Sequence, residues 1–152
     1  LTIVLKERLG LTSEIYKSYH PSGRIGAQLK RIKDIMHVDN QVPIVYLNTK
    51  GMNAIITMTE KRLGCTGVIN EKEELVGIIT DGDLRRHATM DFSNVQAKDL
   101  MTYNPITVTI DFFVAQVLQI MREKKISQVF IINKERKILG IVHIHDILTL
   151  KS

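Results

Sequence analysis

The sequence predicts an α/β (α+β) fold in which two copies of one β-α-β-β-α unit pack together with pseudo-twofold symmetry. Three observations lead to this prediction. The sequence repeats itself at an offset of 63 residues. Each copy has two apolar runs of strand length joined by a polar turn, and an amphipathic helix precedes them. The 152 residues are 44% hydrophobic and 24% charged, which is typical of a globular protein with a core.

The repeat is clearest where residues 62–84 are aligned with residues 125–147. Of these 23 pairs, five are identical. The identical pairs are Ile69/Ile132, Asn70/Asn133, Gly77/Gly140, Ile78/Ile141 and Asp83/Asp146. Upstream, residues 34–36 (Asp-Ile-Met) correspond to residues 99–101 (Asp-Leu-Met) after a slip of two residues. Because the apolar pattern and the turns repeat together, the chain is interpreted as a duplication of one structural unit.

Each copy is expected to contain the same elements in the same order. A short N-terminal segment ends in Met36 or Met101, and an extended segment follows it. Next comes a helix, in which Val114, Val117 and Met121 of the second copy fall on one face. A two-stranded hairpin and a second helix complete the copy. The expected ranges are 43–46 and 106–108 for the first strands, 50–62 and 111–124 for the helices, 66–70 with 75–80 and 128–133 with 138–142 for the hairpins, and second helices that begin near Gly82 and His145.

The duplication has a physical reason. One unit, with a small sheet that its helices cover on one side only, would be marginally stable alone. Two units can bury each other's exposed sheets, and the crevice between them would contain two equivalent pockets. The expected organisation is residues 1–31 as a preceding segment, 32–88 as the first copy, 89–96 as a polar linker and 97–152 as the second copy.

Composition argues against several classes of protein. The single cysteine, Cys65, allows no intrachain disulfide and fits a reducing cytoplasm. No apolar run approaches the ~20 residues that cross a bilayer, so no membrane partner is expected. The net charge of +5 favours anionic partners, but the basic residues are dispersed and Trp is absent, so nucleic acid is not expected. The chain begins with Leu1 rather than Met, which indicates a fragment.

The ends of the two hairpins carry a family resemblance. Residues 77–84 (Gly-Ile-Ile-Thr-Asp-Gly-Asp-Leu) and residues 140–147 (Gly-Ile-Val-His-Ile-His-Asp-Ile) resemble the end of a CBS domain. The resemblance covers the chain from about Ile32 to the C-terminus. It implies a flat, disc-like pair of CBS domains, a module that commonly binds adenosyl compounds or other nucleotides.

A narrower resemblance concerns residues 20–26 (His-Pro-Ser-Gly-Arg-Ile-Gly), which are similar to the stretch joining the sugar-isomerase (SIS) domain to the CBS pair in arabinose-5-phosphate isomerases. It implies that residues 1–31 are the C-terminal remnant of a SIS domain and a linker. That cytoplasmic family interconverts D-arabinose 5-phosphate and D-ribulose 5-phosphate for the biosynthesis of Kdo and lipopolysaccharide. His20 matches the family's His suspected of acid–base catalysis. One His cannot isomerise a sugar, so this chain alone is expected to be inactive and its intact parent active.

Thr80 and Asp83 have two compatible interpretations. A Thr followed three residues later by an acidic residue is close to a helix capping box. In CBS modules this pair binds a nucleotide, the Thr hydroxyl meeting a phosphate or ribose and the carboxylate accepting two hydrogen bonds from the ribose diol. In the second copy His143 replaces the Thr and Asp146 is retained. The resemblance therefore implies ligand binding by these four residues, with the positions in the second copy able to hold a second nucleotide or the sugar-acid part of a larger one.

Other candidate residues lie close to these. Gly64, Cys65 and Thr66 precede a strand and are expected to line the ligand cleft. His143, His145 and Asp146 could form a zinc set, but their spacing is short and no Cys adds to it, so no metal site is expected.

The sequence is compatible with three functions. The first is a regulatory module that binds a nucleotide such as AMP or ATP, or the end product CMP-Kdo, and reports to the SIS isomerase domain of its parent. The second is a structural module that only forms a homodimer or higher oligomer through its CBS pair. The third is an isomerase in its own right. None of them requires a cofactor.

Overall fold

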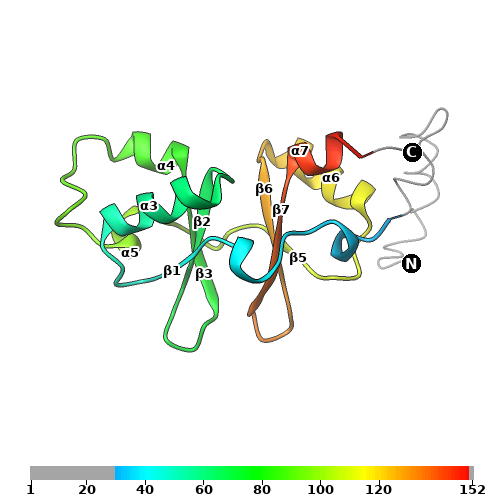
Figure 1. Ribbon diagram of the computed structural model, residues 1–152, viewed down its shortest axis with the longest axis horizontal. Coiled ribbons are helices and arrows are strands. Elements are labelled where there is room, and N and C mark those ends of the chain that lie inside the picture. Colours follow the sequence, from blue (N-terminus) through cyan, green and yellow to red (C-terminus); the bar gives the residue numbers. More distant parts are fainter. Residues whose placement is uncertain (1–29, 151–152) are drawn as a thin grey trace.

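The structure, a computed structural model, describes residues 30–150 and consists of two halves that lie side by side (Figure 1). The first half contains β1 (Ile44–Tyr46), α3 (Gly51–Lys61), β2 (Cys65–Ile69), β3 (Leu75–Thr80), α4 (Asp81–Arg86), α5 (Ala97–Leu100) and β4 (Thr102–Tyr103). The second half contains the 3-10 helix η1 (Ile32–Asp34), β5 (Thr107–Val108), α6 (Val114–Lys124), β6 (Gln128–Ile132), β7 (Ile138–His143) and α7 (Ile144–Leu148). The 3-10 helix η2 (Asp39–Gln41) lies on the segment that leads from the second half to the first. The predicted order β-α-β-β-α is confirmed in both copies.

The two sheets share one topology. In the first half the strand order is β1-β2-β3-β4, with β1 parallel to β2 and the others antiparallel. In the second half the order is β5-β6-β7, with β5 parallel to β6 and β6 antiparallel to β7. The longer helices α3 and α6 lie at the same end of the molecule in Figure 1, and the hairpin turns lie at the other end.

The N-terminal arms of the two copies, residues 32–37 and 97–103, are exchanged between the halves. The arm of the second copy forms β4, which pairs with β3 of the first copy through Gly77↔Tyr103 and Ile78↔Thr102. The arm of the first copy reaches the second half, where the backbone N–H of His37 donates to the carbonyl of Ile141 at 2.8 Å. The two halves that pack in space therefore do not coincide with the two successive copies in the sequence. The repeat alone does not predict this exchange.

A methionine of each arm packs on a glycine of the strand that it joins. A Cβ on Gly77 would lie 2.3 Å from the sulfur of Met101, and a Cβ on Gly140 would lie 2.7 Å from the sulfur of Met36. No side chain larger than hydrogen fits at either position without displacing the arm. This contact explains why both the Met and the Gly recur in the repeat.

Apolar side chains fill each half and also the seam between the halves. Each half has its own buried cluster, around Val68 and Ile79 in the first and around Val129 and Val142 in the second. A third cluster joins them: Val42, Cys65 and Leu75 come from the first copy, and Phe130, Ile132 and Ile141 come from the second. The expectation that the two units bury each other's sheets is confirmed.

The backbone also repeats at its left-handed positions. The six non-glycine residues with positive φ among residues 30–150 form three equivalent pairs. The pairs are Arg62/Lys125 at the ends of α3 and α6, Glu73/Arg136 in the hairpin turns, and Asp39/Asn104 after the arms.

One boundary differs clearly from its prediction. The helix expected from residue 111 begins at Val114, because Phe113 is extended and its N–H donates to the side chain of Gln116 at 2.8 Å, which caps the helix there. No helix within residues 30–150 is long and apolar enough to span a bilayer.

Candidate ligand-binding site

Thr80 and Asp83 form the predicted capping box at the start of α4. The N–H of Asp83 donates to the Thr80 hydroxyl oxygen at 3.3 Å, and the Thr80 N–H donates to Oδ2 of Asp83 at 2.9 Å. The Thr80 hydroxyl also lies 3.1 Å from the same carboxylate oxygen, to which it can donate. The local sequence thus positions the carboxylate at the end of β3, as a capping box should.

The Asp83 carboxylate is already fully engaged. Its second oxygen, Oδ1, accepts a hydrogen bond from the hydroxyl of Thr102 on the exchanged arm at 2.7 Å and another from the guanidinium of Arg86. The residue is only 2% exposed. Both carboxylate oxygens therefore have protein donors, and a ribose hydroxyl would have to displace one of them.

Asp146, the equivalent residue of the second copy, is less completely satisfied. Its Oδ2 accepts the N–H of His143 at 2.8 Å and lies 3.0 Å from Nε2 of His37, which comes from the other exchanged arm. Within residues 30–150 no donor contacts Oδ1. The side chain of Asp146 is 28% exposed, in contrast to the buried Asp83.

A cavity of about 370 Å³ opens beside His37, between the segment that links the two halves and the end of α3. One wall consists of His37, the last residue of the first arm, with Asn40 and Gln41 of η2, and the other consists of residues 60, 61 and 63 at the end of α3. The ammonium of Lys61 donates to the carbonyl of Asn40 across the cavity. We call this cavity, together with Asp146, the seam site.

The three residues predicted to line the cleft have different positions. Gly64 is left-handed, with φ of 77°, and lies beside the amide of Gln128 from the second half, so it is at the seam. Cys65 and Thr66 are both buried with 0% exposure, and the Thr66 hydroxyl donates to the carbonyl of Gly67 at 3.2 Å. Gly64 is therefore next to the seam site, whereas the side chains of Cys65 and Thr66 point into the core.

Burial also makes the cysteine unreactive. Loss of hydration, followed by the charge of Asp81, raises the pKa of the Cys65 thiol to about 12. The thiol therefore stays protonated at neutral pH, and the thiolate is the nucleophilic form. A buried, protonated thiol is poorly suited to act as a nucleophile.

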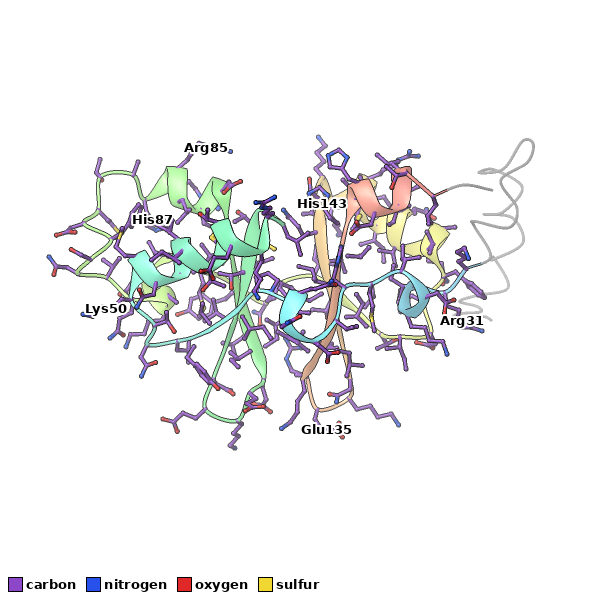
Figure 2. The ribbon with its side chains drawn as sticks, in the orientation of Figure 1. Arg31, Lys50, Arg85, His87, Glu135 and His143 are labelled. Carbon is purple, nitrogen blue, oxygen red and sulfur yellow. The ribbon has the colours of Figure 1, made fainter. Side chains whose placement is uncertain are left out.

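The imidazole of His143 belongs to a small cluster at the start of α7. It stacks on the ring of His145 with 4.9 Å between centroids, and its Nδ1 accepts the His145 N–H at 3.0 Å. Burial, together with the neighbouring His145 and His37, lowers the pKa of His143, and Asp146 partly opposes this. Figure 2 shows His143 beside the seam, near the helix end of the molecule. No group of metal-ligating side chains suited to an ion occurs within residues 30–150.

His20 lies outside the described residues. His37, Gln41 and Lys61 were not predicted as site residues. His37 and Thr102 occupy equivalent positions, after Met36 and Met101, and each contacts the equivalent Asp, but the repeat alone does not reveal these contacts because they join residues distant in sequence.

The fold and the site together define a class: a tandem-repeat module whose two copies exchange arms and hold a polar cavity at their seam. The chain belongs to the CBS domain family, because the family model described as "CBS domain" matches residues 32–89 and 97–152.

Three curated relatives align with nearly the whole chain. Uncharacterized protein RP505 of Rickettsia prowazekii is 41% identical over 99% of this chain. Arabinose 5-phosphate isomerase KdsD of Pseudomonas aeruginosa is 36% identical and that of Escherichia coli K12 is 32% identical, each over 97% of this chain. The chain spans 46% of the length of each of these relatives.

Solved structures support the fold independently. The CBS domain pair of protein MJ0100, in complex with 5'-methylthioadenosine and S-adenosyl-L-methionine, superposes with a TM-score of 0.71 and 27% identity, covering 79% of this chain and 94% of that one. A conserved uncharacterized protein of Pyrococcus horikoshii superposes with a TM-score of 0.68 and 28% identity, covering 80% and 91%.

Proposed function

We propose that this chain is the regulatory ligand-binding module of an arabinose-5-phosphate isomerase and that its ligand is a nucleotide or a nucleotide-sugar. The observation that carries the proposal is a cavity lined by His37, whose imidazole contacts the partly exposed carboxylate of Asp146. The cavity volume of about 370 Å³ falls in the range of small-molecule pockets, roughly 300–1,000 Å³.

The side chains of the seam site fit such a ligand chemically. Oδ1 of Asp146 can accept a hydrogen bond from a ribose hydroxyl, as a carboxylate with free lone pairs does. The ammonium of Lys61 can attract a phosphate or a sugar carboxylate. Gly64 follows Leu63 of the cavity wall and lies beside Gln128 of the second half. His143 donates its N–H to Asp146.

The relatives support both parts of the proposal. The MJ0100 CBS pair binds two adenosine compounds, which favours a nucleoside-containing ligand. The similarity to KdsD favours a parent that interconverts D-arabinose 5-phosphate and D-ribulose 5-phosphate. In that setting the module would report ligand occupancy to a SIS domain, and CMP-Kdo, as an end product for lipopolysaccharide, would be a feedback ligand in the cytoplasm.

Binding should be tested by thermal unfolding of the chain with AMP, ATP, CMP and CMP-Kdo. We expect at least one of them to raise the melting temperature, since a ligand at 100 times its Kd stabilises by about 2.7 kcal/mol. Asp146→Asn should abolish the shift, because an amide presents an NH₂ group or a weaker acceptor to the ribose hydroxyl.

Asp99→Asn is the matched control. Asp99 caps α5 in the same way, since the Gln96 N–H donates to its carboxylate at 2.9 Å, but it is exposed and does not line the seam site. It should keep the full ligand response. The absence of any shift at millimolar ligand, or an undiminished shift in Asp146→Asn, would contradict the proposal.

A purely structural role is favoured by a different observation. Met52 and Ile56, one turn apart on α3, are 45% and 50% exposed, which suits a contact between copies of the chain. An oligomer that depends on these two side chains, in a chain without any nucleotide response, would support this alternative. We expect the isolated chain not to isomerise arabinose 5-phosphate in either case, and turnover by the purified chain would overturn that expectation.

A further inference from the structure

A second pocket lies at the end of the seam opposite to the seam site. Its volume is about 470 Å³, and it is formed by the first half together with the β6–β7 turn of the second half. Leu75, which lines this pocket, is the first residue of β3 and lies at the hairpin end of the molecule. Thr80, the last residue of β3, lies at the helix end, where the seam site is found. Figure 2 shows Glu135, the neighbour of Arg136, at the hairpin end, far from His143. We call this cavity the hairpin-end pocket.

The hairpin-end pocket combines an apolar floor with a cationic rim. Leu47, Val76 and Met101 contribute apolar surface, whereas Lys98 and Arg136 contribute two positive charges. Within residues 30–150 neither cation has a carboxylate at ion-pair distance. Two unneutralised cations at one pocket attract an anion, because each lacks a counter-ion of its own.

Arg136 is held in position by the backbone across the seam. Its carbonyl accepts the Leu75 N–H at 2.9 Å, and its guanidinium donates to the Leu75 carbonyl through Nε at 3.3 Å and Nη2 at 3.0 Å. These bonds use two of the five N–H donors of the guanidinium, so the others can still bind an anion. A fixed Arg loses less side-chain entropy on binding than a free one.

The equivalent region of the other half has the same backbone but a different charge. Arg136 and Glu73 are equivalent, with φ of 63° and 65°, and Asn104 and Asp39 are equivalent, with φ of 55° and 57°. Lys33 corresponds to Lys98, but replacing the Arg by Glu and the Asn by Asp leaves the equivalent region without a net positive charge. The repeat therefore preserves the turns and not the charge, so the cationic character of the hairpin-end pocket does not follow from the fold.

Tyr103 completes the pocket. Its side chain is 65% exposed at the rim, although it belongs to the paired strand β4, and its equivalent in the first arm is Val38. An exposed ring next to two cations can cover a planar or apolar group whose anionic end the cations hold.

From these features we infer that the hairpin-end pocket is a second binding site, for a small phosphorylated compound that carries a planar or apolar group. The phosphate would bind Lys98 and Arg136, and the organic group would lie on the apolar floor against Tyr103. This site is separate from the seam site, and the inference does not depend on the proposed regulatory function.

The experiment is titration of the full chain with phenyl phosphate at fixed ionic strength, followed by the backbone amide shifts in NMR spectra. We expect saturable shifts at Leu75, Lys98 and Tyr103. Arg136→Gln and Lys98→Gln should each weaken binding about tenfold, as expected for loss of a charge-assisted hydrogen bond. Inorganic phosphate should bind more weakly than phenyl phosphate, and Tyr103→Ala should remove that difference.

Controls separate a site from general attraction to a basic protein. Lys134→Gln removes a positive charge from the same turn without lining the pocket, and Asp146→Asn changes a residue of the seam site that does not line the pocket either. Both should bind phenyl phosphate normally. No saturable shift at these amides, or equal weakening in Lys134→Gln, would overturn the inference. Because Lys98 and Arg136 come from different elements, a folding defect in one variant leaves the other as a test.

Discussion

At the scale of single residues, Asp83 and Asp146 are equivalent in the repeat and unequal in their surroundings. Asp83 accepts hydrogen bonds from Thr80, Arg86 and Thr102 and is buried. Asp146 keeps one oxygen without a donor among residues 30–150 and is partly exposed. The difference follows from neighbours that the repeat does not preserve, since Thr149 stands where the first copy has Arg86. Asp83 is thus mainly structural, and the proposed function assigns ligand binding to Asp146.

This difference predicts unequal losses of stability. Asp83→Ala should lower the free energy of unfolding by about 2–4 kcal/mol, because it removes a helix cap and leaves several buried donors without an acceptor. Asp146→Ala should cost only about 1 kcal/mol, the usual value for a cap at a partly exposed helix start. Urea denaturation of the two variants measures both values. Equal losses in the free energy of unfolding would show that the two carboxylates contribute equally to stability, which would contradict this prediction.

At the scale of elements, sequence reasoning succeeded where the signal is local. The strands and helices of each copy were predictable because the apolar periodicity extends over whole elements such as α6 and β3. The capping box of Thr80 and Asp83 was predictable because its two residues lie three apart. Strand β4 was not predictable, because it has only two residues, both exposed, and it pairs with the strand β3, which is distant in sequence. The exchange of arms, and with it His37 at the seam site, was hidden for the same reason.

The contact between arm and strand can be tested at Gly77. A Cβ there would overlap the Met101 sulfur, so Gly77→Ala should destabilise the protein by about 1–3 kcal/mol, the usual cost of overpacking. Met101→Ala should relieve much of this cost in the double variant, which a double-mutant cycle in urea denaturation would reveal. Gly82→Ala is the matched control, because a Cβ there would meet no atom closer than 3.5 Å. Additive effects of the Gly77 and Met101 changes would contradict the proposed contact.

At the scale of the whole molecule, the seam makes the two halves one folding unit. Phe130 is fully buried, and a Cβ on Gly67 of the first copy would lie 2.9 Å from the tip of its ring. The exchanged arms add hydrogen bonds and apolar contacts between the copies. A ligand at the seam would therefore act on both halves, which is what a regulatory module requires.

Cooperativity between the halves is the measurable consequence. Phe130→Ala should lower the stability by about 3–5 kcal/mol, as truncation of a buried aromatic residue does. If the halves unfold together, this change should lower the urea midpoint equally for NMR amides of Ile79 in the first half and Val142 in the second. Met58→Ala, in the core of the first half and outside the seam cluster, should likewise shift the midpoint of Val142. If each variant shifted the midpoint of its own half alone, the two copies would be independent domains, and binding at the seam could not be transmitted through a shared core.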